Sequence, residues 1–185
     1  MPVQIGSVAH NFSNPTGLLS DCHRRVEMFI GSLKAVADVS DRALNDETRH
    51  SLDLALRCFR EAAPKHTADE EESLFPRLRQ ISDPELQACL ARLDALEEDH
   101  RWAEPLHQTV DGLGRKYLEH GRLSPYDAHI FRESVYKLHA MYQRHIEVED
   151  KEVFPVADKL LSSHLKSQIA EEMAERRGTK AIVSL

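Results

Sequence analysis

In a pattern that occurs twice along this chain, four histidines are each followed, four residues later, by a glutamate. The pairs are His23 and Glu27, His66 and Glu70, His100 and Glu104, and His145 and Glu149. Residues four apart lie on one face of an α-helix, with Cβ atoms about 6 Å apart, so each pair can direct an imidazole and a carboxylate toward one point. Imidazole nitrogens and carboxylate oxygens are ligands of divalent and trivalent metals. The spacing therefore predicts metal binding by helices.

The pairs form a doubled pattern. After His66 and after His145 the chain continues with a second acid at the fifth position, then an aliphatic residue, phenylalanine and proline, as in Leu74-Phe75-Pro76 and Val153-Phe154-Pro155. The pairs that begin at His23 and His100 precede these two stretches, and both read His-Arg-x-x-Glu. Scattered surface charge does not account for a repeated order of this length. The repetition indicates one metal site assembled from two similar halves.

The chain has only seven glycines and long stretches in which apolar residues recur with the helical period, so we expect an all-α protein. A first helix should start near Thr16, after Asn14-Pro15. A second should run from about Asp46 through His66 to about Leu78, with a kink or bulge at Pro64.

The sequence after residue 81 predicts three more helices. The third starts at Ser82-Asp83-Pro84, where a capping side chain precedes proline, and continues past Pro105 until Gly112, Gly114 and Gly121 loosen or end it. The fourth starts at Ser124-Pro125. A short fifth helix covers roughly 163–177 and ends at Gly178.

Four long helices with short connections predict an antiparallel up-down-up-down four-helix bundle, here two duplicated αα-hairpins, followed by a short C-terminal helix. We divide the chain into an N-terminal extension (1–14), the bundle (15–162) and a C-terminal helix and tail (163–185).

The four histidines of the pattern fall one on each long helix, so the bundle should enclose four imidazoles and at least two carboxylates. Burying so many ionisable groups without a cation is prohibitive, and two metal ions bridged by carboxylates remove the difficulty. The set contains no thiolate, which favours iron or manganese over zinc. With two ferric ions and an oxo bridge, two carboxylates leave a net positive charge and four leave none. Charge balance is thus a reason to consider Glu27 and Glu104 as additional metal ligands or as side chains that support the ligands.

The ordered set His23, His66-x-x-x-Glu70, His100, His145-x-x-x-Glu149 resembles the hemerythrin-like (HHE cation-binding) family of bacterial type, over roughly residues 15–160. The resemblance implies an antiparallel four-helix bundle around a non-haem di-iron centre, with two iron ions joined by an oxo or hydroxo bridge and manganese as the alternative. It implies that the histidines are terminal ligands and that Glu70 and Glu149 bridge the ions. The spacings also resemble those of bacterial proteins that repair iron centres after nitrosative stress.

The chain departs from the oxygen-carrying members of that family. Those have five histidines, with His-x-x-x-His on the third helix, where this chain has Glu104 four residues after His100. A carboxylate in place of a neutral imidazole favours the ferric state. We therefore expect reactivity toward oxygen or nitric oxide, or their sensing, rather than oxygen transport.

Two functions arise as hypotheses. The first is a protein that binds or senses O2, NO or iron itself, in stress response or iron homeostasis, with a small diatomic molecule as its ligand. The second is a di-iron oxidoreductase acting on nitric oxide or peroxide. Whether the protein is an enzyme stays open, because it depends on Glu27 and Glu104. If both bind metal, the ions are nearly saturated; if either is free, it can act as an acid–base group. A purely structural role for the metal is a third hypothesis.

Several residues near the pattern have simpler interpretations. We expect His107 to line the next layer of the bundle, Tyr142 to fill the core, and Cys22 to be an inert buried thiol. The histidines outside the pattern should be solvated or structural, namely His10, His50, His120, His129, His139 and His164.

Composition excludes some partners. A formal net charge of −7 over 185 residues argues against nucleic acid. No apolar run approaches the roughly 20 residues of a membrane span, and the first residues lack the features of a signal peptide. Three cysteines without a Cys-x-x-Cys pair fit a reducing compartment, so we expect a cytoplasmic protein.

Overall fold

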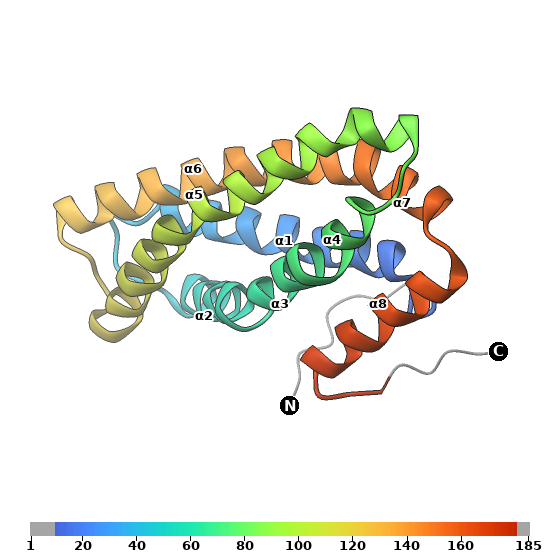
Figure 1. Cartoon of the computed structure of the whole chain (residues 1–185). Coiled ribbons are helices and arrows are strands. Elements are labelled where there is room, and N and C mark those ends of the chain that lie inside the picture. The colour runs from blue at the N-terminus through green and yellow to red at the C-terminus, as the bar shows by residue number, and fades with distance from the viewer. Residues whose placement is uncertain (1–9, 181–185) are drawn as a thin grey trace. The chain divides into compact units, whose positions relative to one another are not determined.

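The computed structural model describes residues 10–180, and these residues form helices and no strand (Figure 1). This confirms the predicted all-α class. The up-down-up-down order of a bundle stays a prediction. So does the division into extension, bundle and C-terminal helix, of which residues 1–9 and 181–185 lie outside the described part of the chain.

The helical elements succeed one another with short connections. Two of them, η1 and η2, are π-helical. In chain order the elements are α1 (Pro15–Asp38), α2 (Asp46–Glu61), α3 (Ala63–Ala68), η1 (Asp69–Leu74), α4 (Phe75–Leu78), α5 (Pro84–His120), α6 (Pro125–Val148), η2 (Glu149–Val153), α7 (Phe154–Leu160) and α8 (Ser163–Arg176).

The predicted helix starts are confirmed, and side-chain caps explain them. A capping side chain accepts a hydrogen bond from one of the first backbone N–H groups, which have no partner within the helix. Asn14 accepts from Gly17 at 3.0 Å before α1, and Asn45 forms a capping box with Thr48 before α2. Comparable caps precede α5, α6 and α8, made by Asp83, Ser124 and Ser162.

Proline explains where the helices change their geometry. The expected interruption at Pro64 is confirmed, because α2 ends at Glu61 and α3 begins at Ala63. The two π-turns were not predicted. In each of them the phenylalanine N–H bonds the carbonyl five residues back, from Phe75 to Glu70 and from Phe154 to Glu149. Pro76 and Pro155 come directly afterwards, and their rings would clash with the carbonyl four residues back in an α-helix; the wider turn relieves this clash.

Two of the three glycines expected to loosen or end the third helix lie within α5 and do not end it. This helix continues through Pro105, Gly112 and Gly114 to His120, so Gly112 and Gly114 do not end it. A Cβ on Gly114 would lie 2.7 Å from a methyl carbon of Leu56, so the missing side chain lets α5 approach α2 closely. The helix ends at Gly121, whose φ of +70° suits glycine.

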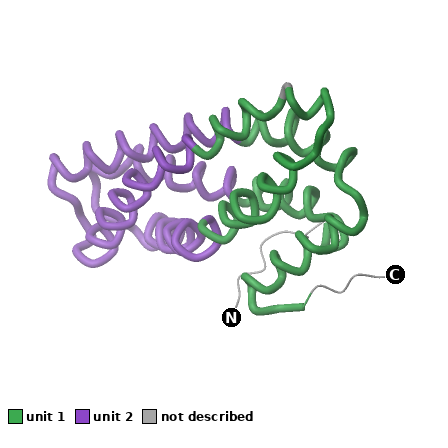
Figure 2. The backbone as a smooth tube through the Cα atoms, viewed as in Figure 1, with its two compact units in different colours: residues 1–25, 64–97, 146–185 green, residues 26–63, 98–145 purple. Residues whose placement is uncertain are grey.

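The chain divides into two compact units (Figure 2). Unit 1 comprises residues 1–25, 64–97 and 146–185. Its core joins the start of α1, the segment from η1 to α4, the first turns of α5, and α7 with α8. Within this unit α8 contacts η1. The buried side chains of this core are mostly aliphatic and aromatic, and they include Leu19, Leu74, Phe75, Leu93, Ile169 and Met173.

Unit 2 comprises residues 26–63 and 98–145, and has an apolar interior of its own. Tyr117 is 1 % exposed, and its hydroxyl donates to the carbonyl of Arg42 at 2.8 Å, which satisfies the polar end of a buried aromatic side chain. The other large buried side chains of this unit include Ile30, Leu33, Leu52, Phe131 and Leu138.

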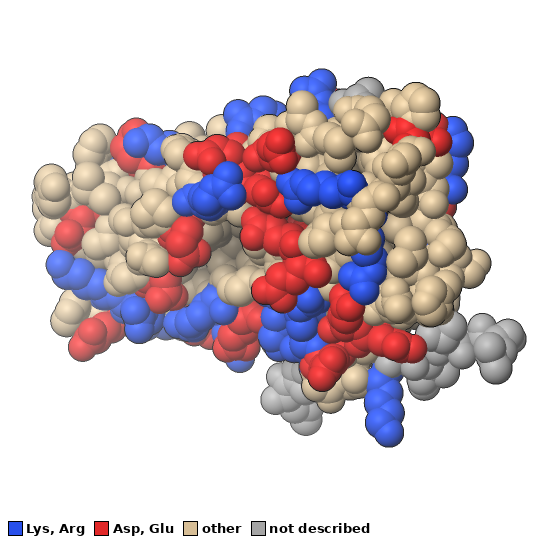
Figure 3. Space-filling view, viewed as in Figure 1, with Lys and Arg blue, Asp and Glu red and all other residues tan. Residues whose placement is uncertain are grey.

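Acidic and basic side chains are interspersed over the face that Figure 3 shows. Many acidic and basic side chains of the protein form ion pairs within one unit, such as Arg79 with Asp94 and Glu97 in unit 1, and Lys116 with Asp127 in unit 2. Among residues 10–180, none of the helices combines the length and the apolar character that crossing a membrane requires.

Candidate metal centre

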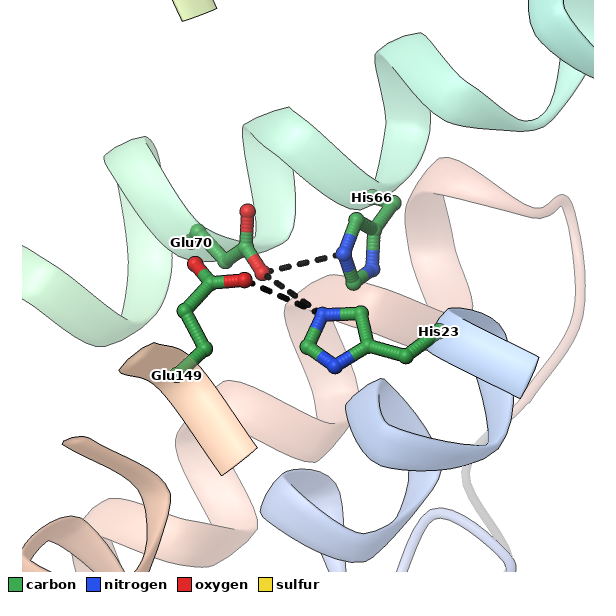
Figure 4. Close-up of side chains that lie close together, drawn as sticks. All are labelled: His23, His66, Glu70 and Glu149. Atoms are coloured by element: carbon green, nitrogen blue, oxygen red, sulfur yellow. Dashed lines mark ion pairs between the residues drawn. The ribbon is translucent and has the colours of Figure 1, made fainter. Parts of the chain in front are cut away.

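Four of the predicted ligands meet inside unit 1. His23, His66, Glu70 and Glu149 each offer one ligand atom, and these atoms all lie within 4.8 Å of one another (Figure 4). All four side chains are buried, and both glutamates are 0 % exposed. His66 Nε2 lies 3.0 Å from Glu70 Oε1, and His23 Nε2 lies 3.1 Å from Glu149 Oε2. The duplicated pattern thus becomes one compact group of imidazoles and carboxylates.

The elements explain why these side chains converge. His23 comes from α1, His66 from α3, Glu70 from η1 and Glu149 from η2. Glu70 and Glu149 occupy equivalent places in their π-turns, since the carbonyl of each accepts from the phenylalanine five residues later. π-turns of this kind often lie at functional sites. Here the Phe-Pro sequence after each glutamate produces the turn, so the turn and the ligand are parts of one repeated motif.

The charges of this group call for a cation. Burial by itself lowers the pKa of a histidine, but hydrogen bonds to Asp150, Glu149 and Glu70 raise the pKa of His23 well above its ordinary value. The pKa of His66 likewise rises to about 10 against the effect of burial, through the charge of Glu70 and a hydrogen bond to Cys22. Protons on the two imidazoles offset the buried carboxylates when no metal is bound. A metal ion would do the same, and the nitrogen and oxygen donors present suit one.

Asp150 supports the His23 imidazole from behind. Its Oδ1 lies 2.8 Å from His23 Nδ1 and accepts from the Ser20 hydroxyl at 2.9 Å, while Arg24 pairs with the other oxygen. A carboxylate on Nδ1 keeps the proton there and leaves Nε2 directed at Glu149 and Glu70, as is common for metal-binding histidines. Asp150 is the second acid of the repeated pattern, so the sequence contained the signal for this residue although the spacing alone assigned it no role.

The other two predicted histidines meet inside unit 2. His100 Nε2 and His145 Nε2 lie 3.1 Å apart, and the ring centroids are 4.7 Å apart. His145 is buried, and Asp99 lies behind it, with Oδ2 3.5 Å from His145 Nδ1. Burial alone would raise the pKa of Asp99, but His145 and Arg144 lower it. Two imidazole nitrogens at this separation can share a proton or bind a cation.

Glu27 and Glu104 lie elsewhere. Both side chains are exposed, and Glu104 accepts a hydrogen bond from Gln108 at 2.8 Å. The structure therefore brings together six of the eight residues that the pattern selected, as a group of four and a pair, and leaves these two glutamates on the surface.

None of the six histidines that we expected to be solvated or structural is buried. His139 is half-buried, and the rest are exposed: His10, His50, His120, His129 and His164.

Cys22 lies in a more polar environment than we expected. Arg25 donates a hydrogen bond to its Sγ at 2.8 Å. Burial would raise the pKa of this thiol, but the hydrogen bond and charge of His66, together with the charges of Arg25 and Arg177, lower the pKa to about 7. The sequence placed Cys22 beside His23 and gave no sign of its contact with His66.

His107 and Tyr142 form a hydrogen-bonded pair in unit 2. His107 Nε2 lies 2.8 Å from the Tyr142 hydroxyl, and the His107 ring packs on Phe59 with centroids 5.2 Å apart. Burial disfavours the charged imidazole and lowers the pKa of His107 to about 4, although the charge of Glu104 acts in the opposite direction.

This pair predicts a specific loss of stability in acid. Between pH 6.5 and pH 4 the unfolded chain binds a proton at residue 107 that the folded protein does not bind, so the free energy of unfolding falls as the pH falls. From pH 7 to pH 5 this group alone should cost about 2 kcal/mol. We expect His107→Phe to flatten the acid limb of a plot of unfolding free energy against pH by that amount, measured by urea denaturation. Exposed His129→Phe is the control; equal slopes for wild type and His107→Phe would contradict the assignment.

Two comparisons relate this chain to known proteins. Residues 14–157 match the family model of the hemerythrin HHE cation-binding domain. An uncharacterised protein of Haemophilus influenzae is 26 % identical over 170 residues, which cover 91 % of this chain and 93 % of that protein. The family match spans most of the chain and contains every residue of the buried group and of the histidine pair. This chain belongs to the hemerythrin HHE cation-binding domain family.

Proposed function

We propose that the protein holds two iron ions and binds or senses a small diatomic molecule, O2 or NO, or iron itself, in stress response or iron homeostasis. The observation that carries the proposal is the convergence of His23, His66, Glu70 and Glu149 inside unit 1. Two carboxylates that are 0 % exposed are costly to bury unless a positive charge accompanies them. The repeated sequence pattern also selects His100 and His145, and we propose these two imidazoles as further ligands.

The donor atoms favour iron. Nitrogen and oxygen donors without thiolate suit six-coordinate iron or manganese, whereas structural zinc sites are four-coordinate and usually include cysteine. Cys22 adjoins His66 but is not one of the four residues whose ligand atoms converge. Manganese accepts the same donors, so metal analysis has to distinguish the two metals.

The burial of the site favours a small ligand. His23 is 1 % exposed, and both glutamates are 0 % exposed, so a bulky substrate has no direct approach to these atoms. With Glu27 and Glu104 on the surface, four imidazoles and two carboxylates leave open coordination positions on two six-coordinate ions. When bound at this site, iron would donate electrons to such a ligand or accept electrons from it. The chain's own residues hold the imidazoles in place, as Asp150 does for His23, and exclude bulk water.

We propose a location in the cytoplasm, where reducing conditions would keep Cys22, Cys58 and Cys89 as thiols.

The test is elemental analysis of protein purified without added metal, combined with its ultraviolet–visible spectrum. We expect close to two iron ions per chain and near-ultraviolet absorption that dithionite bleaches. Azide should produce new bands, because it can occupy an open coordination position. Zinc, or no metal in a stably folded protein, would refute the proposal. Steady consumption of nitric oxide or peroxide with a reductant present would assign the protein to the oxidoreductases instead.

A further inference from the structure

One acidic side chain beside the metal group has no counterpart in the other half of the repeat. Asp69 lies three residues after His66, and the corresponding residue after His145 is Val148. Asp69 is nevertheless 0 % exposed. A buried carboxylate that replaces an apolar residue needs a specific partner, so the surroundings of Asp69 show what it contributes.

The partners of Asp69 lie at the C-terminal end of α8, where Arg176 is the last helical residue and Arg177 is the cap. Arg176 Nη1 donates to Asp69 Oδ1 at 2.9 Å, and Arg177 Nη2 donates to Asp69 Oδ2 at 2.6 Å. Each oxygen of the carboxylate thus receives its own guanidinium. Hydrogen bonds between charged groups are stronger than neutral ones, and two of them with different oxygens fix the orientation of a carboxylate.

A second set of contacts joins the same two elements one turn further along. The Ser73 hydroxyl donates to Glu172 at 2.5 Å and accepts from Arg176 at 2.8 Å. Arg77 donates to both oxygens of Glu172, at 2.7 and 3.1 Å, and also to the backbone carbonyl of Ser73 at 2.8 Å. Asp69 and Ser73, near the two ends of η1, therefore both form hydrogen bonds with side chains of α8.

We propose that α8 positions Glu70 for metal binding, with Asp69, Arg176 and Arg177 as the positioning residues. The π-helix is rare and occurs mostly as single turns inside α-helices, so we expect η1 to depend on support from its surroundings. The bonds to α8 supply that support directly beside Glu70. Val148, directly before η2, occupies the position that Asp69 has in η1, so these ion pairs support one half of the repeat only. The family match ends at residue 157, before α8 begins. This inference rests on the proposed metal-binding function.

The test compares two variants that each lose two ion pairs in unit 1. Asp69→Asn keeps the shape of the side chain but removes the charge that holds Arg176 and Arg177. Arg79→Gln is the matched control, because Arg79 also pairs with two carboxylates, those of Asp94 and Glu97, away from η1. Glu172→Gln weakens the second set of contacts but leaves both ion pairs of Asp69 in place, and it serves if Asp69→Asn does not fold.

Two measurements are made on each variant. In iron-loaded protein, Asp69→Asn should release iron to a competing chelator about tenfold faster than wild type, as is typical when a group that supports a ligand is lost. In metal-free protein, hydrogen exchange of the backbone amides from 69 to 78 should accelerate about tenfold. Glu172→Gln should change both rates in the same direction by less, and Arg79→Gln should change neither.

The outcomes separate this inference from the proposed function. Unchanged iron release in Asp69→Asn would overturn it even if exchange became faster, because α8 would then only stabilise the fold. Equal acceleration of release in Arg79→Gln would overturn it as well, since the effect would be general. If wild-type protein binds no iron, the proposed function fails, and the exchange measurement still tests whether α8 orders η1.

Discussion

Glu149→Ala and His66→Ala are each expected to lose most of the bound metal and to lower the Tm. Both side chains are buried, and each directs a donor atom into the group of four. Loss of a residue that merely supports a ligand costs about 10–100-fold in metal affinity, so loss of a ligand itself should cost at least about 100-fold. Elemental analysis of the purified variants, with differential scanning calorimetry, measures both effects.

Truncation to alanine also leaves a cavity, and a cavity lowers stability whether or not metal is bound. Glu149→Gln separates the two effects, because it keeps the side-chain volume and removes the charge. It should lose metal as Glu149→Ala does, with a smaller fall in Tm. His129→Ala and His164→Ala are the matched controls, since both histidines are exposed and outside the pattern. Full metal content in both His66→Ala and Glu149→Ala would refute the site. Large losses in the controls would mean that the ligands lie elsewhere.

The helix starts could be predicted because their causes are local. Asn14, Asp83 and Ser124 each cap the helix that begins at the next residue, a proline, and a cap concerns only residues two or three positions apart. The meeting of His66 with Glu70 is local for the same reason. The convergence of His23 with Glu149 is not local, and it could be foreseen only because the pattern is repeated along the chain.

The supporting residues could not be predicted, because their partners lie far away in the sequence. Asp150 contacts His23 across 127 positions, and Arg177 contacts Asp69 across 108. Such pairs depend on how each helix is rotated about its axis. The π-turns change that rotation, since one extra residue per turn shifts every later side chain of the helix. The Phe-Pro sequence is recognisable as part of the repeat, but its effect on helix geometry was not predicted.

The exposure of Glu27 and Glu104 shows a limit of spacing as evidence. Both lie four residues after a histidine of the pattern, as Glu70 and Glu149 do. The buried and the exposed glutamates differ in the residues that follow them in the sequence. Glu70 and Glu149 precede a Phe-Pro sequence and lie in π-turns, whereas Glu27 and Glu104 lie within the regular helices α1 and α5. The spacing from histidine to glutamate selects candidates, and the residues after the glutamate distinguish those that turn inward.

Removal of the metal should strongly destabilise the protein. A ligand present at about a thousand times its Kd stabilises the folded state by about 4 kcal/mol. For a chain of this size that corresponds to a fall in Tm of about 8–16 °C after chelation. Protons on His23 and His66 then offset the carboxylates of Glu70 and Glu149, so the metal-free protein should stay folded at neutral pH. Glu149→Gln is the control, because the Tm of a protein that holds no metal should not change on chelation.

The destabilisation should depend on pH in a defined direction. The pKa of His66 is about 10 in the folded protein and ordinarily 6.5. Its protonated form therefore stabilises the metal-free fold fully below pH 6.5, and that stabilisation is lost as the pH rises toward 10. In the metal-loaded protein the imidazole is a neutral ligand, so this loss does not occur. The difference in Tm between loaded and metal-free protein should thus be larger at pH 9 than at pH 7. A difference that stays constant or shrinks would show that protons on His66 do not replace the metal charge.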